Sequence, residues 1–523
     1  MDTLRYGVPL AIAFVSMAGL GRHAAGCGPP QCATRAFFRG ALIGFFAFGT
    51  LFGLLAQLGA GFPVAGGLMG LLVLVGLCSA AADLRSRPRT RLLYAGLASA
   101  GVLLSLLMQV MPVQADAADP GQYAFAATTL FRGEWLVQHV PVGAGLARMS
   151  ALLHEAETTR APSLAVPWAP AALGAPLTPN AITAVCAGYL AVAVLLFVDL
   201  LGPGLDPVGR AVLGLGALGP LNAVAVLSAG QLAQTFALMV ALATIWLCRA
   251  QVSAGVRAGV LVAAGYLVSA GYPEFLLAFP LYWGCLVLIC RSTFRQAAAD
   301  GLCILAGFIV VQAATRLDNI RFLVAQQGSP TTFWPLAHTP GTVLDVWTIV
   351  IANGDLPRRL VALLTIPIAV YVWHRFVRRG TPTARPFAMM WVLIAGLVPF
   401  AVVWTWVALQ AANPNYVTFK VACWLSFGLM LGVWLLLGQT TVWLRGVGAT
   451  VVLVLAATRA FLLVSDVSER VPAYVAGPSA AGPAVEIASG AECLVHAPTS
   501  DQWVVARTIA VSAAPARNCT VLE

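Results

Sequence analysis

The chain has 523 residues, of which 60% are hydrophobic and 10% are charged, and its mean hydropathy is +0.86. These values exclude a soluble globular protein and predict an all-α polytopic membrane protein of about 13–14 transmembrane helices, because a bilayer core requires apolar runs of about 20 residues. The net charge of +10 does not indicate a nucleic-acid partner, since the arginines fall in short loops between apolar runs, where such residues set membrane topology.

Four apolar runs precede the first long polar segment, and they cover residues 6–20, 41–57, 64–81 and 92–111. The first run lacks a basic leading region and a convincing cleavage site, so we expect a retained helix and not a signal peptide. The loop at residues 83–91 carries Arg85, Arg87, Arg89 and Arg91 and is therefore expected in the cytoplasm. The fourth run then leads to the outer side of the membrane.

Alternation of the later apolar runs assigns a side to each remaining segment. These runs cover residues 182–201, 211–227, 236–247, 260–269, 276–289, 302–314, 361–373, 387–409, 421–437 and 448–464. The predicted organisation is N-terminal transmembrane helices at 1–111, a first outer (periplasmic) loop with amphipathic helices at 112–180, transmembrane helices at 181–315, a second outer loop at 316–358, C-terminal transmembrane helices at 359–466 and a periplasmic tail at 467–523.

The acidic candidates for catalysis are Asp116 and Asp119 in the first outer loop and Glu274 at a later outer turn. Asp119 and the proline after it form a helix start, and the apolar positions of residues 123–130 suit an amphipathic helix lying on the membrane surface. Glu274 follows Pro273, which breaks one helix and leaves the carboxylate at the start of the next. Each carboxylate suits either a catalytic role or plain stabilisation of a helix N-terminus.

Further polar residues fall at the predicted outer ends of helices, namely Tyr123, Gln231, Tyr272, Asn413, Asn415, Tyr416 and Lys420. Lys420 is the one lysine of the chain, and it suits either contact with a lipid phosphate or ordinary snorkelling to the membrane surface. Gln231 suits either a hydrogen bond to a sugar or a bridge between helices. Because polar groups at membrane depth are costly, their gathering on one side indicates function.

Four short patterns lie among these residues: Asp119-x-x-x-Tyr123, residues 230–234, residues 271–275 and Tyr416-x-x-x-Lys420. They resemble patterns of bacterial members of the GT-C class of membrane glycosyltransferases. The resemblance implies transfer of a sugar from a polyprenyl-phosphate carrier to a glycan or glycolipid acceptor of the cell envelope, at the periplasmic face of the bacterial inner membrane. It also implies that Asp119, or its neighbour Asp116, is the catalytic base and that Lys420 contacts the carrier phosphate.

The residue types fit this chemistry. An acceptor hydroxyl that attacks an anomeric carbon needs a base within hydrogen-bond range, which Asp119, Asp116 or Glu274 would provide. The departing lipid phosphate needs a cation more than a general acid. The expected substrate-binding residues are Tyr123, Gln231, Tyr272, Asn415, Tyr416, Lys420, Arg316 and Arg321. We expect no metal, although a divalent cation between Asp119 and Glu274 is compatible with the residue types.

Two other classes of membrane protein also have about the number of transmembrane helices predicted for this chain. A transporter or lipid-carrier flippase is one alternative, but such proteins often carry inverted repeats and polar sites at the bilayer midplane, and this chain has no repeat of fixed period. An O-antigen polymerase or ligase is the other. Those enzymes place arginines and a histidine in a large outer loop, and Arg316, Arg321 and His338 form a sparse version of that pattern.

The eleven cysteines show no metal-binding spacing. Most lie in or beside apolar runs and suit small core residues. Cys493 and Cys519 fall in the polar tail, where a disulfide between them is plausible if the tail lies outside the cytoplasm.

Overall fold

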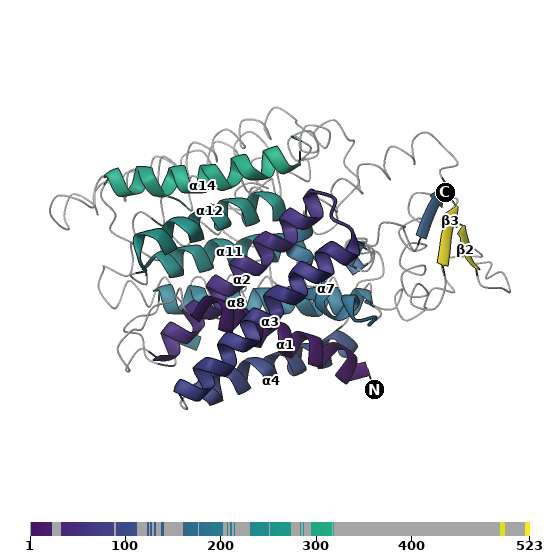
Figure 1. Cartoon of the computed structure of the whole chain (residues 1–523), viewed down its shortest axis with the longest axis horizontal. Coiled ribbons are helices and arrows are strands. Elements are labelled where there is room, and N and C mark those ends of the chain that lie inside the picture. Colours follow the sequence, from purple (N-terminus) through teal and green to yellow (C-terminus); the bar gives the residue numbers. More distant parts are fainter. Residues whose placement is uncertain are drawn as a thin grey trace, which may run out of the picture.

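The computed structural model describes most of the first 315 residues and two short pieces near the end of the chain (Figure 1). The described residues are 2–22, 33–87, 90–111, 123–124, 126–127, 130–131, 137–140, 160–175, 177–201, 207, 210–211, 214, 231–249, 252–272, 283, 286, 294–315, 317, 492–496 and 518–522.

Eight helices in this part of the chain are long and apolar enough to cross a membrane. They are α1 (Asp2–Arg22), α2 (Ala33–Gln57), α3 (Phe62–Ser86), α4 (Arg91–Val110), α8 (Pro179–Leu201), α11 (Leu232–Arg249), α12 (Ala254–Gly271) and α14 (Phe294–Ala314). The predicted all-α polytopic membrane fold is therefore confirmed. The predicted spans at 211–227, at 276–289 and from 361 onward lie wholly or almost wholly outside the described residues.

The helices extend beyond the apolar runs into polar sequence. For example, α12 begins at Ala254 and not at residue 260, because Ser253 accepts a 3.4 Å hydrogen bond from the backbone N–H of Val256 and so caps the helix. Likewise α14 begins at Phe294, well before the predicted start at residue 302. Hydropathy marks the part of each helix within the hydrocarbon core, whereas capping and ion pairs decide where the helix ends.

Glycines let neighbouring helices touch through their backbones. A Cβ placed on Gly19 of α1 would collide with the carbonyl oxygen of Gly76 of α3, and one placed on Gly307 of α14 would collide with the carbonyl oxygen of Val262 of α12. Membrane helices have little hydrophobic drive to associate in lipid, so close packing of small residues is a principal source of their attraction. Together with the ion pair between Arg22 and Asp83, the Gly19–Gly76 contact shows that α1 runs parallel to α3.

Contacts between helix ends define a common polarity for the bundle. Arg22 at the end of α1 pairs with Asp83 near the end of α3, and Arg35 at the start of α2 pairs with Asp199 near the end of α8. Arg249 at the end of α11 donates a 2.8 Å hydrogen bond to the carbonyl oxygen of Leu200. These helix ends lie together and are called the arginine-rich end; the other end of the bundle is called the opposite end.

The segment at residues 160–175 enters the bundle from the opposite end and is called the re-entrant segment. It consists of the 3-10 helix η3 (Ala161–Leu164) and the helix α7 (Ala165–Ala172), and it packs against α1, α2, α8, α11 and α12. Every side chain from 161 to 168 is buried. The sequence predicted an outer loop with amphipathic helices here, whereas this part of the loop is inside the protein.

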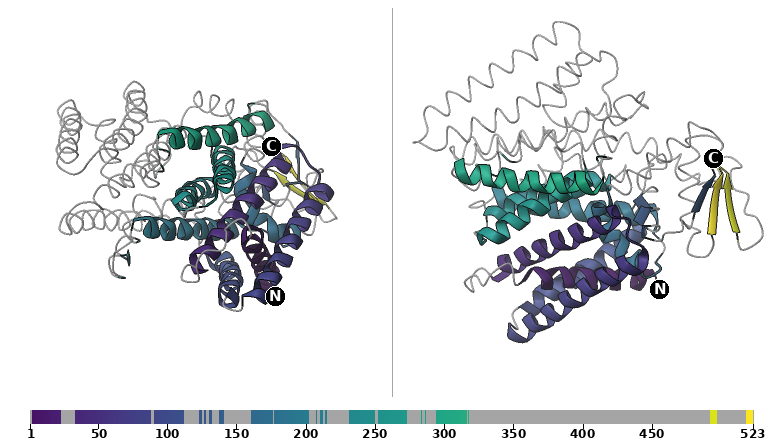
Figure 2. Two further views of the ribbon diagram at one scale, coloured as in Figure 1. Left: turned by 60° about the vertical axis from the view of Figure 1, so that its left-hand side comes forward. Right: turned by 45° about the horizontal axis from the view of Figure 1, so that its top comes forward.

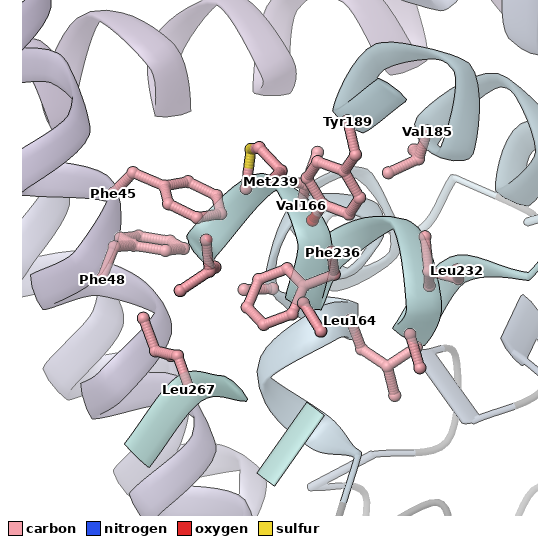
Figure 3. Close-up of a cluster of buried hydrophobic side chains, with 14 of the residues drawn as sticks. Phe45, Phe48, Leu164, Val166, Val185, Tyr189, Leu232, Phe236, Met239 and Leu267 are labelled. Carbon is pink, nitrogen blue, oxygen red and sulfur yellow. The ribbon is translucent and has the colours of Figure 1, made fainter. Parts of the chain in front are cut away.

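An aromatic core surrounds the re-entrant segment (Figure 3). The rings of Tyr189 and Phe236 lie 5.6 Å apart, next to Leu164 and Val166 of the re-entrant segment. The hydroxyl of Tyr189 donates a 3.2 Å hydrogen bond to the carbonyl oxygen of Ser163. Irregular backbone is tolerated at membrane depth only where protein groups satisfy it, and this bond provides one such partner.

A small parallel sheet accompanies the helices. Its strands are β1 (Val137–Val140), β2 (Glu492–His496) and β3 (Asn518–Leu522), in the order β1-β3-β2. Figure 1 and the right panel of Figure 2 place this sheet beyond the end of the bundle at which α1 begins, which is the opposite end. The sheet joins the predicted first outer loop to the tail, a pairing that the sequence did not predict.

Candidate functional site

Three of the predicted site residues belong to the described part of the chain: Tyr123, Gln231 and Tyr272. All three are buried. The other predicted site residues lie outside the described residues, and their roles stay predictions; they are Asp116, Asp119, Glu274, Arg316, Arg321, Asn415, Tyr416 and Lys420.

Tyr123 is held inside the opposite end of the bundle. It is 6% exposed, and its hydroxyl oxygen accepts a 3.3 Å hydrogen bond from Nη1 of Arg160. Its described helical neighbours Ala124, Ala126 and Ala127 are buried as well. The prediction of a helix after Asp119 agrees with these residues, but their side chains pack into the protein core and do not face the membrane surface.

Arg160 is a site residue that the sequence analysis missed. It stands directly before η3 and occupies its N-cap position, with a half-buried side chain. Of the charged residues that the structure describes at the opposite end, Arg160 is the one set within the packed bundle, whereas Arg5 is exposed. An arginine placed just before an apolar, proline-rich run was the available signal, but Arg160 was not among the arginines predicted to bind substrate.

Gln231 directly precedes α11 and Tyr272 directly follows α12, so both lie at the opposite end of the bundle. The carbonyl oxygen of Gln231 accepts the 3.2 Å bond that begins α11, from the backbone N–H of Thr235. Tyr272 directly follows α12, is 2% exposed, and donates its backbone N–H to the carbonyl oxygen of Val268. Because α11 and α12 pack on each other and both contact η3, Gln231 and Tyr272 flank helices that pack against the segment next to Arg160.

A phenol–amide pair joins α12 to α2 at the same end of the bundle. The hydroxyl of Tyr266 in α12 donates a 2.8 Å hydrogen bond to Oε1 of Gln57, the last residue of α2. A Cβ on Gly53 would lie 2.6 Å from the Tyr266 hydroxyl and 2.5 Å from the ring of Pro162 in η3. Helices α2 and α12 therefore meet the re-entrant segment here, two residues beyond Arg160.

Several buried polar side-chain atoms at this end of the bundle have no hydrogen-bond partner in the structure. Gln312 in the last turn of α14 is 7% exposed, and neither its Oε1 nor its Nε2 has a hydrogen-bond partner in the structure. The same holds for Oε1 of Gln234 and Oγ1 of Thr50. Since an unsatisfied buried polar atom costs about 1–3 kcal/mol, such groups need a functional or structural explanation.

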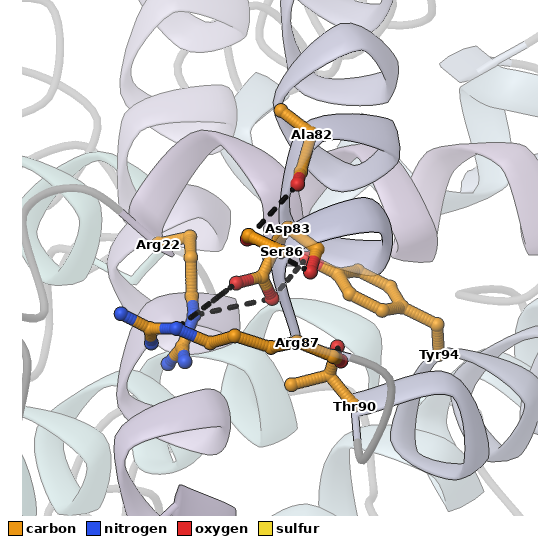
Figure 4. A network of polar contacts seen from close by, with 7 residues as sticks. All are labelled: Arg22, Ala82, Asp83, Ser86, Arg87, Thr90 and Tyr94. Atoms are coloured by element: carbon orange, nitrogen blue, oxygen red, sulfur yellow. Dashed lines mark hydrogen bonds and ion pairs between the residues drawn. The ribbon is translucent and has the colours of Figure 1, made fainter.

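At the arginine-rich end the described carboxylates have cationic partners, and Figure 4 shows those of Asp83. Nε of Arg22 lies 3.3 Å from both carboxylate oxygens of Asp83, and the hydroxyl of Tyr94 donates to the same carboxylate. Asp300 likewise accepts two hydrogen bonds from Arg257. These groups join helix ends, and a structural role accounts for them.

The charged residues of the described spans lie near helix ends and leave the middle of the spans uncharged. Asp83 and Asp199 fall in the last turn of their helices, and Asp300 falls within the first two turns of α14. A transporter site at the bilayer midplane usually needs polar or ionisable groups there. The part of the chain that the structure describes lacks such a charged midplane group.

Among the described residues, no group of three or more His, Cys, Asp or Glu could hold a metal ion. The helices and their buried polar end define the chain as a multi-pass helical membrane protein. Comparison with protein-family models, curated proteins and solved structures finds no match for this chain. The GT-C resemblance therefore rests on the short sequence patterns.

Proposed function

We propose that this protein is a membrane glycosyltransferase of the GT-C kind. It would transfer a sugar from a polyprenyl-phosphate carrier to a glycan or glycolipid acceptor of the cell envelope. The opposite end of the bundle would face the periplasm, and the arginine-rich end the cytoplasm, because positively charged loops are retained inside. The protein would thus lie in the bacterial inner membrane with its site toward the outer leaflet.

The observation that carries this proposal is the Arg160–Tyr123 contact. It sets a guanidinium, whose charge persists at any physiological pH, inside the buried polar end of a lipid-embedded protein. A phosphate group that leaves from a lipid-linked sugar gains negative charge in the transition state, and a cation fixed nearby lowers the barrier. Arg160 therefore supplies the kind of group that this reaction requires.

The proposed base, Asp119, lies close in sequence to Tyr123, the hydrogen-bond partner of Arg160. Asp119 precedes Tyr123 by four positions, which is about one turn if the helix continues to it. Asp119, or its neighbour Asp116, would remove the proton from the acceptor hydroxyl. The oxygen would then form a bond to the anomeric carbon as the bond from that carbon to the phosphate oxygen breaks. The carrier phosphate would leave with the electron pair, stabilised by Arg160 together with Lys420.

The remaining candidates would bind the substrates. Gln231 and Tyr272 are buried next to helices that contact η3, and they would donate hydrogen bonds to sugar hydroxyls or accept hydrogen bonds from them. Glu274 follows Tyr272 by two positions and would provide a second carboxylate for the acceptor. Asn415, Tyr416, Arg316 and Arg321 would complete the site from later segments, with the last two near the phosphate.

The direct test is to incubate the purified protein in lipid vesicles with a panel of radiolabelled polyprenyl-phosphate sugars and an envelope lipid extract as acceptor. Release of carrier phosphate with one donor, lost in Asp119→Asn, supports both the enzyme class and the base. Asparagine keeps the size and hydrogen bonding of the side chain while removing its basicity. Full activity in a folded Asp119→Asn protein would contradict the assignment of that residue.

The same vesicle assay tests the two alternative classes, a lipid-carrier flippase and an O-antigen polymerase or ligase. Movement of the intact donor between leaflets without loss of its sugar would identify a lipid-carrier flippase. Transfer of a preassembled oligosaccharide, with no use of single-sugar donors, would identify a polymerase or ligase. Either result from folded protein would replace the glycosyltransferase proposal.

A further inference from the structure

The two cysteines of the tail occupy paired positions in the small sheet. Strands β2 and β3 are parallel, and the Cα of Cys493 in β2 pairs with the Cα of Cys519 in β3. On its other edge β3 pairs with β1, where the Cα of Cys519 pairs with the Cα of Val137. This register supports a disulfide more strongly than the shared location of the two cysteines in the tail, because it places both residues in one row across the sheet.

The spacing of such a row allows a covalent bridge. Adjacent strands lie about 4.7–4.9 Å apart, and paired positions share one face of the pleat. Disulfides join residues whose Cα atoms lie about 4.4–6.8 Å apart. The backbone register of β2 and β3 therefore meets the first geometric requirement for a disulfide between Cys493 and Cys519.

The position of the sheet meets the chemical requirement. Figure 1 and the right panel of Figure 2 show it beyond the opposite end of the bundle, away from the arginine-rich end. Arginine-rich ends are retained in the cytoplasm, so the sheet would lie in the compartment outside it. That compartment is oxidising in bacteria, whereas cytosolic thiols are kept reduced.

We propose that Cys493 and Cys519 form a structural disulfide that ties β2 to β3. Each thiol loses its proton, the two sulfur atoms join, and two electrons reduce the disulfide of a thiol–disulfide exchange protein of the oxidising compartment to a dithiol. The bridge closes the chain between the two strands into a loop. It thereby holds β3 in place for its second partner, β1, which belongs to the first outer loop.

The test uses the full-length protein in its native membrane. Cells are treated with N-ethylmaleimide to block free thiols, and the purified protein is digested with trypsin with and without reduction. Cleavage after Arg470, Arg507 and Arg517 puts Cys493 in the peptide 471–507 and Cys519 in the peptide 518–523, each with one cysteine. We expect the two peptides to be linked without reduction and separate after it.

Single serine variants provide the controls. Cys493→Ser should leave Cys519 fully labelled by N-ethylmaleimide, and Cys519→Ser should do the same for Cys493. Cys78 in α3 is a free thiol in the structure, so Cys78→Ser should leave the linked peptides unchanged. Both tail cysteines labelled in the unreduced wild-type protein, or either one linked to a different cysteine, would overturn the proposal. The outcome does not depend on whether the protein is a glycosyltransferase.

Discussion

Tyr266 donates its hydroxyl to Oε1 of Gln57 at 2.8 Å, and this bond joins α12 to the end of α2 across 209 positions of the chain. Gly53 lies one turn before Gln57 and leaves room for both the Tyr266 hydroxyl and the ring of Pro162. The pair therefore marks the place where the re-entrant segment is held between two membrane helices, next to Arg160.

Replacement of Gly53 by alanine tests this arrangement. The new Cβ would lie 2.5 Å from the Pro162 ring, which has no rotamer to relieve the clash, so we expect a loss of stability of about 1–3 kcal/mol. Thermal unfolding in detergent measures it. Gly70→Ala in α3 is the matched control, because a Cβ there meets nothing within 4 Å. Equal melting temperatures for the two variants would contradict the described packing of η3.

The ion pairs of the arginine-rich end should differ in their contribution to stability. Arg257 and Asp300 are 12% and 6% exposed, so Arg257→Gln leaves a buried carboxylate without its partner and should cost about 3–5 kcal/mol. Arg35 and Asp199 are 64% and 38% exposed, so Arg35→Gln should cost less than about 1 kcal/mol. Denaturation midpoints of the two purified variants provide the comparison. A larger loss for Arg35→Gln would refute this ranking.

Much of this fold could be predicted from the sequence, because lipid imposes a simple rule on long apolar runs. The runs located α1 to α4. The Arg22–Asp83 pair, which joins the ends of α1 and α3, was not predicted. The ends of helices were less predictable. Asp300 and Arg257 look like loop residues in a hydropathy profile, yet each neutralises the other within helical structure.

The missed features depend on contacts between distant parts of the chain. The re-entrant segment is too short and too rich in proline to read as a span, and only packing against five helices shows that it is buried. Arg160 was missed for the same reason, since its partner Tyr123 is 37 positions away. The sheet pairs β1 with β3 across most of the chain, and a local pattern does not reveal such a pairing.

The membrane orientation can be tested with fusion reporters. An alkaline phosphatase domain fused after residue 60, in the turn between α2 and α3, should be active, because this turn lies at the opposite end. The same domain fused after residue 87, between α3 and α4, should be inactive while a fluorescent protein at that point is bright. The reverse pattern would place the arginine-rich end outside the cytoplasm and remove the basis for a periplasmic site.

Removal of divalent cations should leave sugar transfer largely intact, because arginine and lysine can stabilise the leaving phosphate without a metal. We expect more than about half of the activity to persist in excess EDTA, measured as release of carrier phosphate. Loss of activity that Mg²⁺ or Mn²⁺ restores would contradict this prediction and favour the alternative of a divalent cation, for which Asp119 and Glu274 are the candidate ligands. Calcium-specific chelation by EGTA serves as the control for chelator effects.

The most direct measurement is the rate of carrier-phosphate release by Arg160→Gln, compared with wild type and with Arg5→Gln. Arg5 is an exposed arginine at the same end and outside the packed bundle, so it controls for the loss of one positive charge. If Arg160 stabilises the departing phosphate, its removal should lower kcat by about 10²–10³-fold while Arg5→Gln remains near wild type. Equal rates for folded Arg160→Gln and wild type would contradict the account.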